Sequence, residues 1–331
     1  MTNRRQLLQR AAAWGMFGTG SFTIPSKAFA ALLPTGRWSA GEGDTVANPL
    51  TPPAHGSIPV AFLISDGAVM IDFTGPWEVF QDVLISTRSE APFRLYTVAE
   101  AQKPIRASGG MKILPDYTIL NAPAPKVLVI PAQSKASENA KGWIRSSAKT
   151  ADVVMSVCNG SFVLASTGLL SGKAATSHHS SYADLETMFP DIRVKRGLRF
   201  VEDANLASAG GLSSGIDLAL RVVERYFGSE VARKTAFNME YQGEGWVHPD
   251  SNAVYAQIPS QTADHPVCPV CGMDSKLSLK TEYKGTTYYF CNPRHKQTFD
   301  DSPRKIHERL KANPLECRLW KRDTNGQNPF L

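Results

Sequence analysis

The chain has 331 residues, a length that corresponds to about two domains of roughly 150 residues each. Hydrophobic residues make up 42% of the chain and charged residues 20%, a composition that supports packed cores and excludes wholesale disorder. It contains no run of about 18 apolar residues, which excludes a predicted membrane-spanning helix. The formal net charge of +6 would by itself suit an acidic partner.

The N-terminus has the features of an export signal. Arg4-Arg5 precedes a weakly apolar stretch, and Ala28-Phe29-Ala30 is a typical cleavage site. We therefore predict a twin-arginine signal peptide over residues 1–30 and a periplasmic protein that is exported after folding. The alternative is a disordered basic N-terminus of a cytosolic protein. Cleavage would remove four basic residues and no acidic one, leaving a charge of +2, so no nucleic-acid binding is expected.

The predicted elements of the central part alternate between short apolar strands and amphipathic helices. This alternation predicts an α/β fold in which a flavodoxin-like parallel sheet has helices on both faces. In chain order the expected elements are a strand at 58–64, a helix at 72–86, strands at 93–99 and 126–132, a helix at 136–148, a strand at 153–157, and helices at 160–169, 182–188, 214–228 and 229–241.

Changes in composition divide the chain into segments. Stretches rich in glycine, proline and small polar residues predict linkers, and clustered cysteines mark a second, smaller module. The expected order is the signal peptide, a linker at 31–56, the α/β domain at 57–243, a linker at 244–264, the cysteine-rich domain at 265–310 and a basic tail at 311–331.

Cys158 lies where an apolar strand runs directly into a helix, the arrangement of a nucleophile elbow. The positive end of the helix dipole and free backbone N–H groups predict a lowered pKa for this thiol. The N–H groups of Asn159 and its neighbours would also stabilise an oxyanion on a substrate. The alternative is a buried, inert cysteine, but Asn159-Gly160 directly after it argues against apolar surroundings.

Residues 57–243 resemble the ThiJ/PfpI superfamily, which has a class I glutamine-amidotransferase-like fold. Within it they are similar to the branch that holds isonitrile hydratase and the amidotransferase-like halves of AraC-type regulators. The matching motifs are IDFTGPWEVF (71–80), LPDYTI (114–119), SVCNGSFVLASTGLLSGKAATSH (156–178), FP (189–190) and ASAGGLSSGIDLALRVVE (207–224).

The resemblance implies that Cys158 is the nucleophile and that Asp72 faces it as acid or base, with a raised pKa. Asp72 could instead, or in addition, cap a helix that starts at Phe73. His178 occupies a place where many relatives have a histidine near the cysteine, and it would act as base or orient a water. A structural role for His178 stays open, as does the choice between it and His179.

Two positions depart from the family pattern. Relatives commonly carry Gly-Gly where this chain has Ala132-Gln133, so an oxyanion-hole amide is in doubt, although the Gln133 side chain could replace it. Asn159 replaces the threonine or alanine that often follows the cysteine, so this chain lacks the neighbouring hydroxyl that contributes to the activity of the hydratase.

The second module contains Cys268 and Cys271 in a C-x2-C pair, followed by Cys291 and His295. Two close pairs of sulfur and nitrogen donors suit tetrahedral Zn²⁺ or Cu(I), which would add folding energy to a short segment. The stretch also resembles the YHS domain and so predicts a small Cys-rich α+β module. The alternative is a disulfide, Cys268–Cys271 or Cys271–Cys291, formed in an oxidising compartment.

Two hypotheses follow for the function. In the first, the chain is an exported cysteine-dependent hydratase or hydrolase that forms a covalent adduct with a small C–N or carbonyl compound, as isonitrile hydratase would. In the second, it is a non-catalytic periplasmic metal-binding or redox-sensing protein. The expected partners are a small-molecule substrate and a metal ion, with a homodimer as a further option; no cofactor is expected in the α/β domain. Cys317, in the basic tail, lacks a motif.

Overall fold

The computed structural model describes residues 46–256 and 266–312. The predicted signal peptide, residues 257–265 and the tail from residue 313, which includes Cys317, lie outside the described residues. Among the described helices, none is long and apolar enough to cross a membrane.

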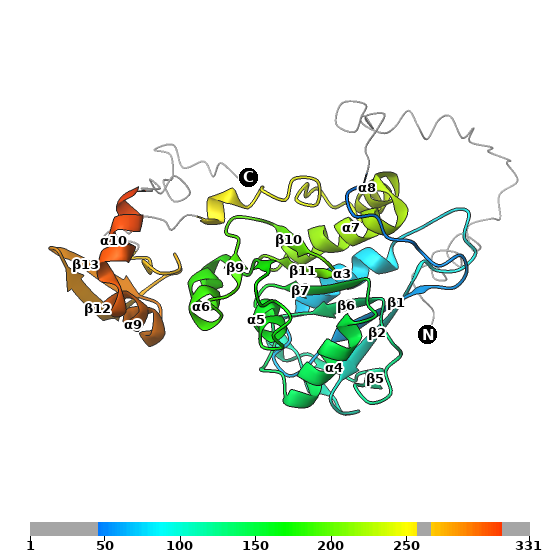
Figure 1. Ribbon diagram of the computed structural model, residues 1–331, viewed down its shortest axis with the longest axis horizontal. Coiled ribbons are helices and arrows are strands. Elements are labelled where there is room, and N and C mark those ends of the chain that lie inside the picture. Colours follow the sequence, from blue (N-terminus) through cyan, green and yellow to red (C-terminus); the bar gives the residue numbers. More distant parts are fainter. Residues whose placement is uncertain (1–45, 257–265, 313–331) are drawn as a thin grey trace, which may run out of the picture. The chain divides into compact units, whose positions relative to one another are not determined.

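A seven-stranded sheet forms the centre of the larger domain (Figure 1). Neighbouring strands are parallel except for the β10–β11 pair at one edge. The strand order is β10-β11-β7-β6-β1-β2-β5, with bounds β1 Ile58–Leu63, β2 Phe93–Ala99, β5 Tyr117–Thr118, β6 Val127–Ile130, β7 Val153–Val157, β10 Phe200–Asp203 and β11 Leu206–Ala209.

Helices cover both faces of this sheet, as the sequence predicts (Figure 1). The central strands β6 and β7 are buried on both faces, and their Val, Ile, Leu and Met side chains fill two separate hydrophobic cores. One core includes side chains of α3 (Met70–Gln81), α7 (Ser214–Phe227) and α8 (Ser229–Asn238), and the other those of α4 (Glu138–Ala148), α5 (Gly160–Ala165) and α6 (Tyr182–Met188).

Several short elements join these layers. They are the antiparallel pair β3 (Ile105–Arg106) and β4 (Lys112–Ile113), the parallel pair β8 (Ala174–Ala175) and β9 (Arg193–Val194), and the 3-10 helices η1 (Ser108–Gly110), η2 (His179–Ser181) and η3 (Ala253–Ala256). Most of these elements, and the β10–β11 hairpin, were not predicted from the sequence, because segments of two to four residues carry too little periodicity to recognise.

The described parts of both predicted linkers pack against the α/β domain. The Leu50 N–H donates to the Arg225 carbonyl at 2.7 Å, and Arg225 Nε donates to the Asn48 carbonyl at 2.8 Å. Trp246 is 2% exposed and belongs to the same core as α3 and α7. Residues 46–56 and 244–256 therefore do not behave as free linkers, and the outer domain boundaries stay a prediction.

The C-terminal module is a two-stranded hairpin followed by two helices. Its elements are β12 (Lys276–Tyr283), β13 (Thr286–Phe290), α9 (Pro293–Asp301) and α10 (Pro303–Ala312). Phe290 and Phe299 are fully buried and pack with Tyr288 into a small core that also includes Cys268 and Cys271. This is the small α+β module that the sequence predicts.

Candidate active site and candidate metal centre

Cys158 lies on a tight turn between β7 and α5, as the sequence predicts. Its φ of 57° is in the left-handed region, and its N–H donates to the Gly210 carbonyl at 2.9 Å. A Cβ at Gly160 would lie 2.1 Å from the Ile130 carbonyl oxygen, so only glycine lets α5 begin this close to the end of β6. The turn presents the sulfur at the carboxyl edge of the sheet, the usual location of sites in such folds.

Asp72 faces this cysteine from the first turn of α3 and is fully buried. Its Oδ2 accepts a hydrogen bond from the Ala132 N–H at 3.1 Å, and its carboxyl also hydrogen-bonds the Cys158 thiol. Val69, not Asp72, is the residue that precedes the helix, so the capping role considered for Asp72 is wrong. Burial raises the pKa of Asp72 to about 7, and the two hydrogen bonds offset only part of this effect.

The Cys158 thiol is only 7% exposed. Burial raises its pKa to about 11, the charge of Asp72 acts in the same direction, and the Leu212 and Asn159 N–H groups act against both. The expectation of a lowered pKa is therefore wrong, because desolvation of the thiolate outweighs the backbone donors at the start of α5. The direction expected for Asp72, a raised pKa, agrees with the structure.

These two pKa values describe one coupled pair rather than two independent groups. Below about pH 7 the carboxyl and the thiol both hold protons, and between about pH 7 and 11 the pair shares one proton. In that range the proton can pass along the hydrogen bond, which leaves a thiolate next to a neutral carboxylic acid. The arrangement therefore supplies a nucleophile and a proton donor together.

His178 lies near this site, but its hydrogen bonds go to Ser180 rather than to the thiol. Its Nδ1 accepts from the Ser180 N–H at 3.2 Å, and its ring packs against Gly211, where a Cβ would lie 2.6 Å from Cδ2. Burial, together with His179, lowers the pKa of His178 to about 4. Within the described residues no hydrogen bond joins His178 to Cys158, so the geometry favours the structural role over the base.

Asn159 and Gln133, the two residues considered as sources of an oxyanion donor, direct their N–H groups to different places. The Asn159 N–H lies on the sulfur side of the turn, while its exposed side chain accepts from the Ser177 hydroxyl at 3.2 Å. The side-chain amide of Gln133 donates to the Leu63 carbonyl at 3.0 Å. This bond uses one of the two N–H groups of the Gln133 amide, and its role as an oxyanion donor stays a prediction.

Leu212, which was not predicted as a site residue, donates a hydrogen bond from its N–H to the Cys158 sulfur. Leu212 has a φ of 36° and follows Gly210-Gly211 in the turn between β11 and α7. The Gly-Gly pair after an apolar strand was a usable signal, because such turns allow a backbone to approach a ligand or another chain segment closely.

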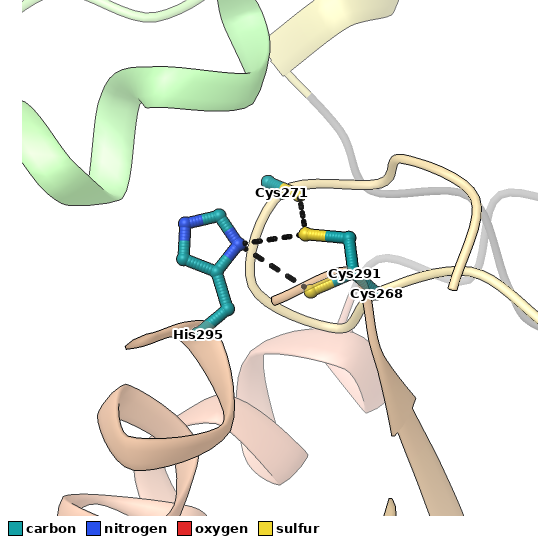
Figure 2. Close-up of side chains that lie close together, drawn as sticks. All are labelled: Cys268, Cys271, Cys291 and His295. Carbon is teal, nitrogen blue, oxygen red and sulfur yellow. Dashed lines mark hydrogen bonds between the residues drawn. The ribbon is translucent and has the colours of Figure 1, made fainter. Parts of the chain in front are cut away.

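The four residues predicted as metal ligands come together in the C-terminal module (Figure 2). The donor atoms of Cys268, Cys271, Cys291 and His295 all lie within 4.8 Å of one another. His295 Nδ1 is 3.6 Å from Cys268 Sγ and 3.2 Å from Cys291 Sγ, and Cys271 Sγ is 3.5 Å from Cys291 Sγ. A tetrahedral ion with bonds of about 2.0–2.3 Å would hold its donors about 3.5–3.8 Å apart, so the residues fit such an ion.

Local backbone structure directs these donors toward one another. Gly272, with a φ of 78°, allows the chain to turn after Cys271, and its N–H donates to the Cys268 carbonyl at 2.8 Å. Asn292 begins α9 by accepting from the His295 N–H at 2.9 Å, and its side-chain nitrogen donates to Cys291 Sγ at 3.2 Å. All four described cysteines are free thiols, so this arrangement favours the metal over the disulfide alternative.

Comparison with known proteins places the two domains. The family model described as the DJ-1/PfpI family matches residues 59–225, about half of the chain. The chain belongs to the DJ-1/PfpI family. A second family model, the YHS domain, matches residues 267–307 of this DJ-1/PfpI protein and covers all four candidate metal ligands.

Relatives of this DJ-1/PfpI protein have different functions. It is 32% identical to isonitrile hydratase from Pseudomonas putida over 190 residues, which is 56% of this chain and 79% of that enzyme. It is 24% identical to the HTH-type transcriptional regulator GbdR from Pseudomonas aeruginosa, over 52% of this chain and 48% of the regulator. A solved ThiJ/PfpI family protein from Pseudomonas syringae matches with a TM-score of 0.51 and 25% identity, over 64% of this chain and 85% of that one.

Proposed function

We propose that this protein is an exported cysteine-dependent enzyme that hydrates a small C–N compound, with isonitriles as the first substrate class to test. The buried contact between Asp72 and Cys158 carries the proposal, because it places a nucleophile and a proton donor next to each other, where both can act on the same substrate carbon. The 32% identity to isonitrile hydratase over most of that enzyme supports the choice of substrate.

In the first half of the reaction, the Cys158 thiolate attacks the terminal carbon of the isonitrile R–N≡C. A C–S bond forms, and the same carbon takes a proton from the neutral Asp72 carboxyl. The product is a thioimidate, S–CH=N–R, on Cys158, with Asp72 left as a carboxylate. The raised pKa of Asp72, about 7, suits it to give up and regain a proton near neutral pH.

In the second half, water adds to the thioimidate carbon while the Asp72 carboxylate takes one of its protons. Asp72 then protonates the nitrogen, the C–S bond breaks, and the hydroxyl proton returns to Asp72. The released product is the formamide R–NH–CHO, and Asp72 and Cys158 return to their starting state. Asp72 moves every proton in this scheme, so His178 is not needed as a base.

The Leu212 and Asn159 N–H groups have a defined part in this reaction. Both donate to the sulfur and so stabilise the thiolate, first as the nucleophile and again when it leaves. Because the Ala132 N–H binds Asp72, this backbone donor does not stabilise developing charge on the substrate. Small, reactive substrates are therefore favoured over amides, whose attack needs a strong oxyanion site.

Turnover by the purified full chain tests the proposal. Isonitriles, amides and glyoxals are incubated with the wild-type protein, Cys158→Ser and the matched control Cys317→Ser. We expect formamide from isonitriles with the wild type and the control, and a loss of at least about 100-fold in Cys158→Ser. Equal turnover in Cys158→Ser and the wild type, or none in either, would exclude the proposed enzyme.

A second candidate function is a non-catalytic domain that binds a small molecule. The low exposure of Cys158 favours it, as does the similarity to the HTH-type transcriptional regulator GbdR. The raised thiol pKa argues against the redox-sensing form of this alternative, because oxidation requires an accessible thiolate. Binding of an isonitrile without formamide release would identify this second function.

The C-terminal module, in this proposal, holds Zn²⁺ or Cu(I) between three thiolates and one imidazole and gains folding energy from the ion.

The twin-arginine pathway exports folded proteins, so the ion would be loaded before the chain reaches the periplasm. Cell fractionation of a strain expressing the full chain, compared with Arg4→Lys/Arg5→Lys, tests the location. Retention of the variant in the cytoplasm is expected, and periplasmic wild type and variant alike would exclude this route.

A further inference from the structure

The turn that carries the Leu212 N–H is held at both ends by Arg199. The Gly210 N–H donates to the Arg199 carbonyl at 2.8 Å, and the Ser213 hydroxyl accepts from the Arg199 guanidinium at 3.2 Å. Ser213 precedes α7 but makes no side-chain capping bond to that helix. Its hydroxyl is thus used to hold the turn rather than to begin the helix.

Arg199 is itself held rigidly. Its guanidinium forms an ion pair with Asp217, which is fully buried in the first turn of α7, and its Nη1 donates to Asn252 Oδ1 at 3.2 Å. Tyr241 hydrogen-bonds both members of the pair. A bidentate guanidinium can hold several partners in one plane, which a lysine ammonium cannot do in the same way.

The segment that follows α8 encloses this ion pair. A Cβ at Gly245 would lie 2.6 Å from Arg199 Nε and 2.8 Å from Asp217 Cγ, so this glycine lets the chain pass directly over the pair. The Arg199 N–H donates to the Pro249 carbonyl at 2.6 Å. The described part of a predicted linker is therefore a support for residues close to Cys158.

We propose that Arg199 is a positioning residue that fixes the Leu212 N–H as a hydrogen-bond donor to the Cys158 sulfur, and that residues 241–252 hold Arg199 in place for this purpose. Arg199 acts through the Gly210–Ser213 turn and does not touch the reacting atoms. Leu212 has a φ in the left-handed region, which is strained for a residue with a side chain, and the hydrogen bonds of Arg199 to this turn hold Leu212 in that conformation. The proposal rests on Cys158 being the reacting thiol of the proposed function.

Ionisation of Cys158 measures this role whether or not the chain hydrates isonitriles. The pH dependence of alkylation by iodoacetamide is followed on the Cys158 peptide by mass spectrometry, in the full chain, with unfolding temperature recorded for each variant. Ser213→Ala removes one exposed hydroxyl and leaves the Arg199–Asp217 pair intact. Arg199→Lys keeps the charge next to Asp217 but loses the planar set of donors.

We expect both variants to raise the apparent pKa of Cys158 by about 0.5–1 unit, because the Leu212 N–H then stabilises the thiolate less. The rate at pH 8 would fall about twofold to fourfold, since the more basic thiolate is a better nucleophile and offsets part of the loss. Arg196→Lys is the matched control, because Arg196 pairs with Glu186 instead. An unchanged pKa in both variants, with or without a lower unfolding temperature, would overturn the proposal; absent turnover with a shifted pKa would overturn only the proposed function.

Discussion

Asp72 and Cys158 come from opposite ends of different elements, the start of α3 and the end of β7, and their buried side chains hydrogen-bond each other. Burial raises the pKa of both groups, and the Asp72 charge raises that of Cys158 further, whereas the hydrogen bond with Cys158 partly stabilises the Asp72 carboxylate. This relationship, more than the turn at Cys158 alone, determines what the site can do.

The pH dependence of hydration follows from this pair. The reactive form holds one shared proton, and it replaces the doubly protonated form as pH rises through the Asp72 pKa of about 7. We expect kcat/KM for an isonitrile to rise tenfold per pH unit below about 7 and to level off above it. A rate that is constant between pH 5 and 9 would contradict the assignment of Asp72.

Asp72→Asn separates thiol acidity from catalysis. Loss of the carboxylate charge lowers the pKa of Cys158 below its value of about 11, so alkylation of the Cys158 peptide at pH 8 becomes faster. Hydration nevertheless falls by about 10²–10⁴-fold, because no group remains to move protons. The exposed Asp66→Asn is the matched control and leaves both rates unchanged. Faster hydration together with faster alkylation would remove the acid/base role.

The same substitution reports on stability. The pKa of Asp72 rises from 3.8 to about 7 on folding, so burying the charge destabilises the folded state by at most about 4 kcal/mol above pH 7 and not at all well below pH 3.8. The free energy of unfolding of the wild-type protein therefore decreases, through ionisation of Asp72, as pH rises from 3.8 to 7. Asp72→Asn should increase the free energy of unfolding at pH 8 and have little effect at pH 4. An equal change at both pH values would rule out ionisation of Asp72 as its cause.

Most of the α/β fold was predictable, because continuous apolar runs such as 153–157 have few alternatives to a buried strand. The elbow at Cys158 was predictable for the same reason. The charge state of the thiol was not, since it depends on burial by residues far along the chain and on the nearby Asp72. Arg199 and Leu212 were missed because their roles arise only when the β11–α7 turn and residues 241–252 meet.

Gly160 tests the close contact that shapes the elbow. A methyl group in Gly160→Ala would lie 2.1 Å from the Ile130 carbonyl oxygen, and we expect destabilisation of about 3 kcal/mol or more in chemical denaturation. Gly142→Ala, within α4, is the matched control: its Cβ would meet only Arg145 at 3.9 Å, and we expect it to stabilise the protein by about 0.5–1 kcal/mol. Equal effects of the two substitutions would show that α5 can shift away from β6.

The cluster of Cys268, Cys271, Cys291 and His295 in the C-terminal module predicts that each chain binds one metal ion there. Cys271→Ser should lower the zinc or copper content of the full chain and make residues 266–312 sensitive to proteolysis, because the ion contributes folding energy. Cys317→Ser, outside the ligand set, should retain the metal. Wild-type protein without metal but with disulfides among Cys268, Cys271 and Cys291 would show that the redox alternative applies instead.

The mass of the Cys158 peptide during turnover tests the central claim most directly. Wild-type protein is mixed with an isonitrile, quenched in acid within the first turnovers and digested. We predict that the Cys158 peptide gains the full mass of one isonitrile, as a thioimidate requires, and that the adduct disappears as formamide accumulates. Formamide production with no adduct on Cys158 at any quench time, and undiminished in Cys158→Ser, would contradict the account.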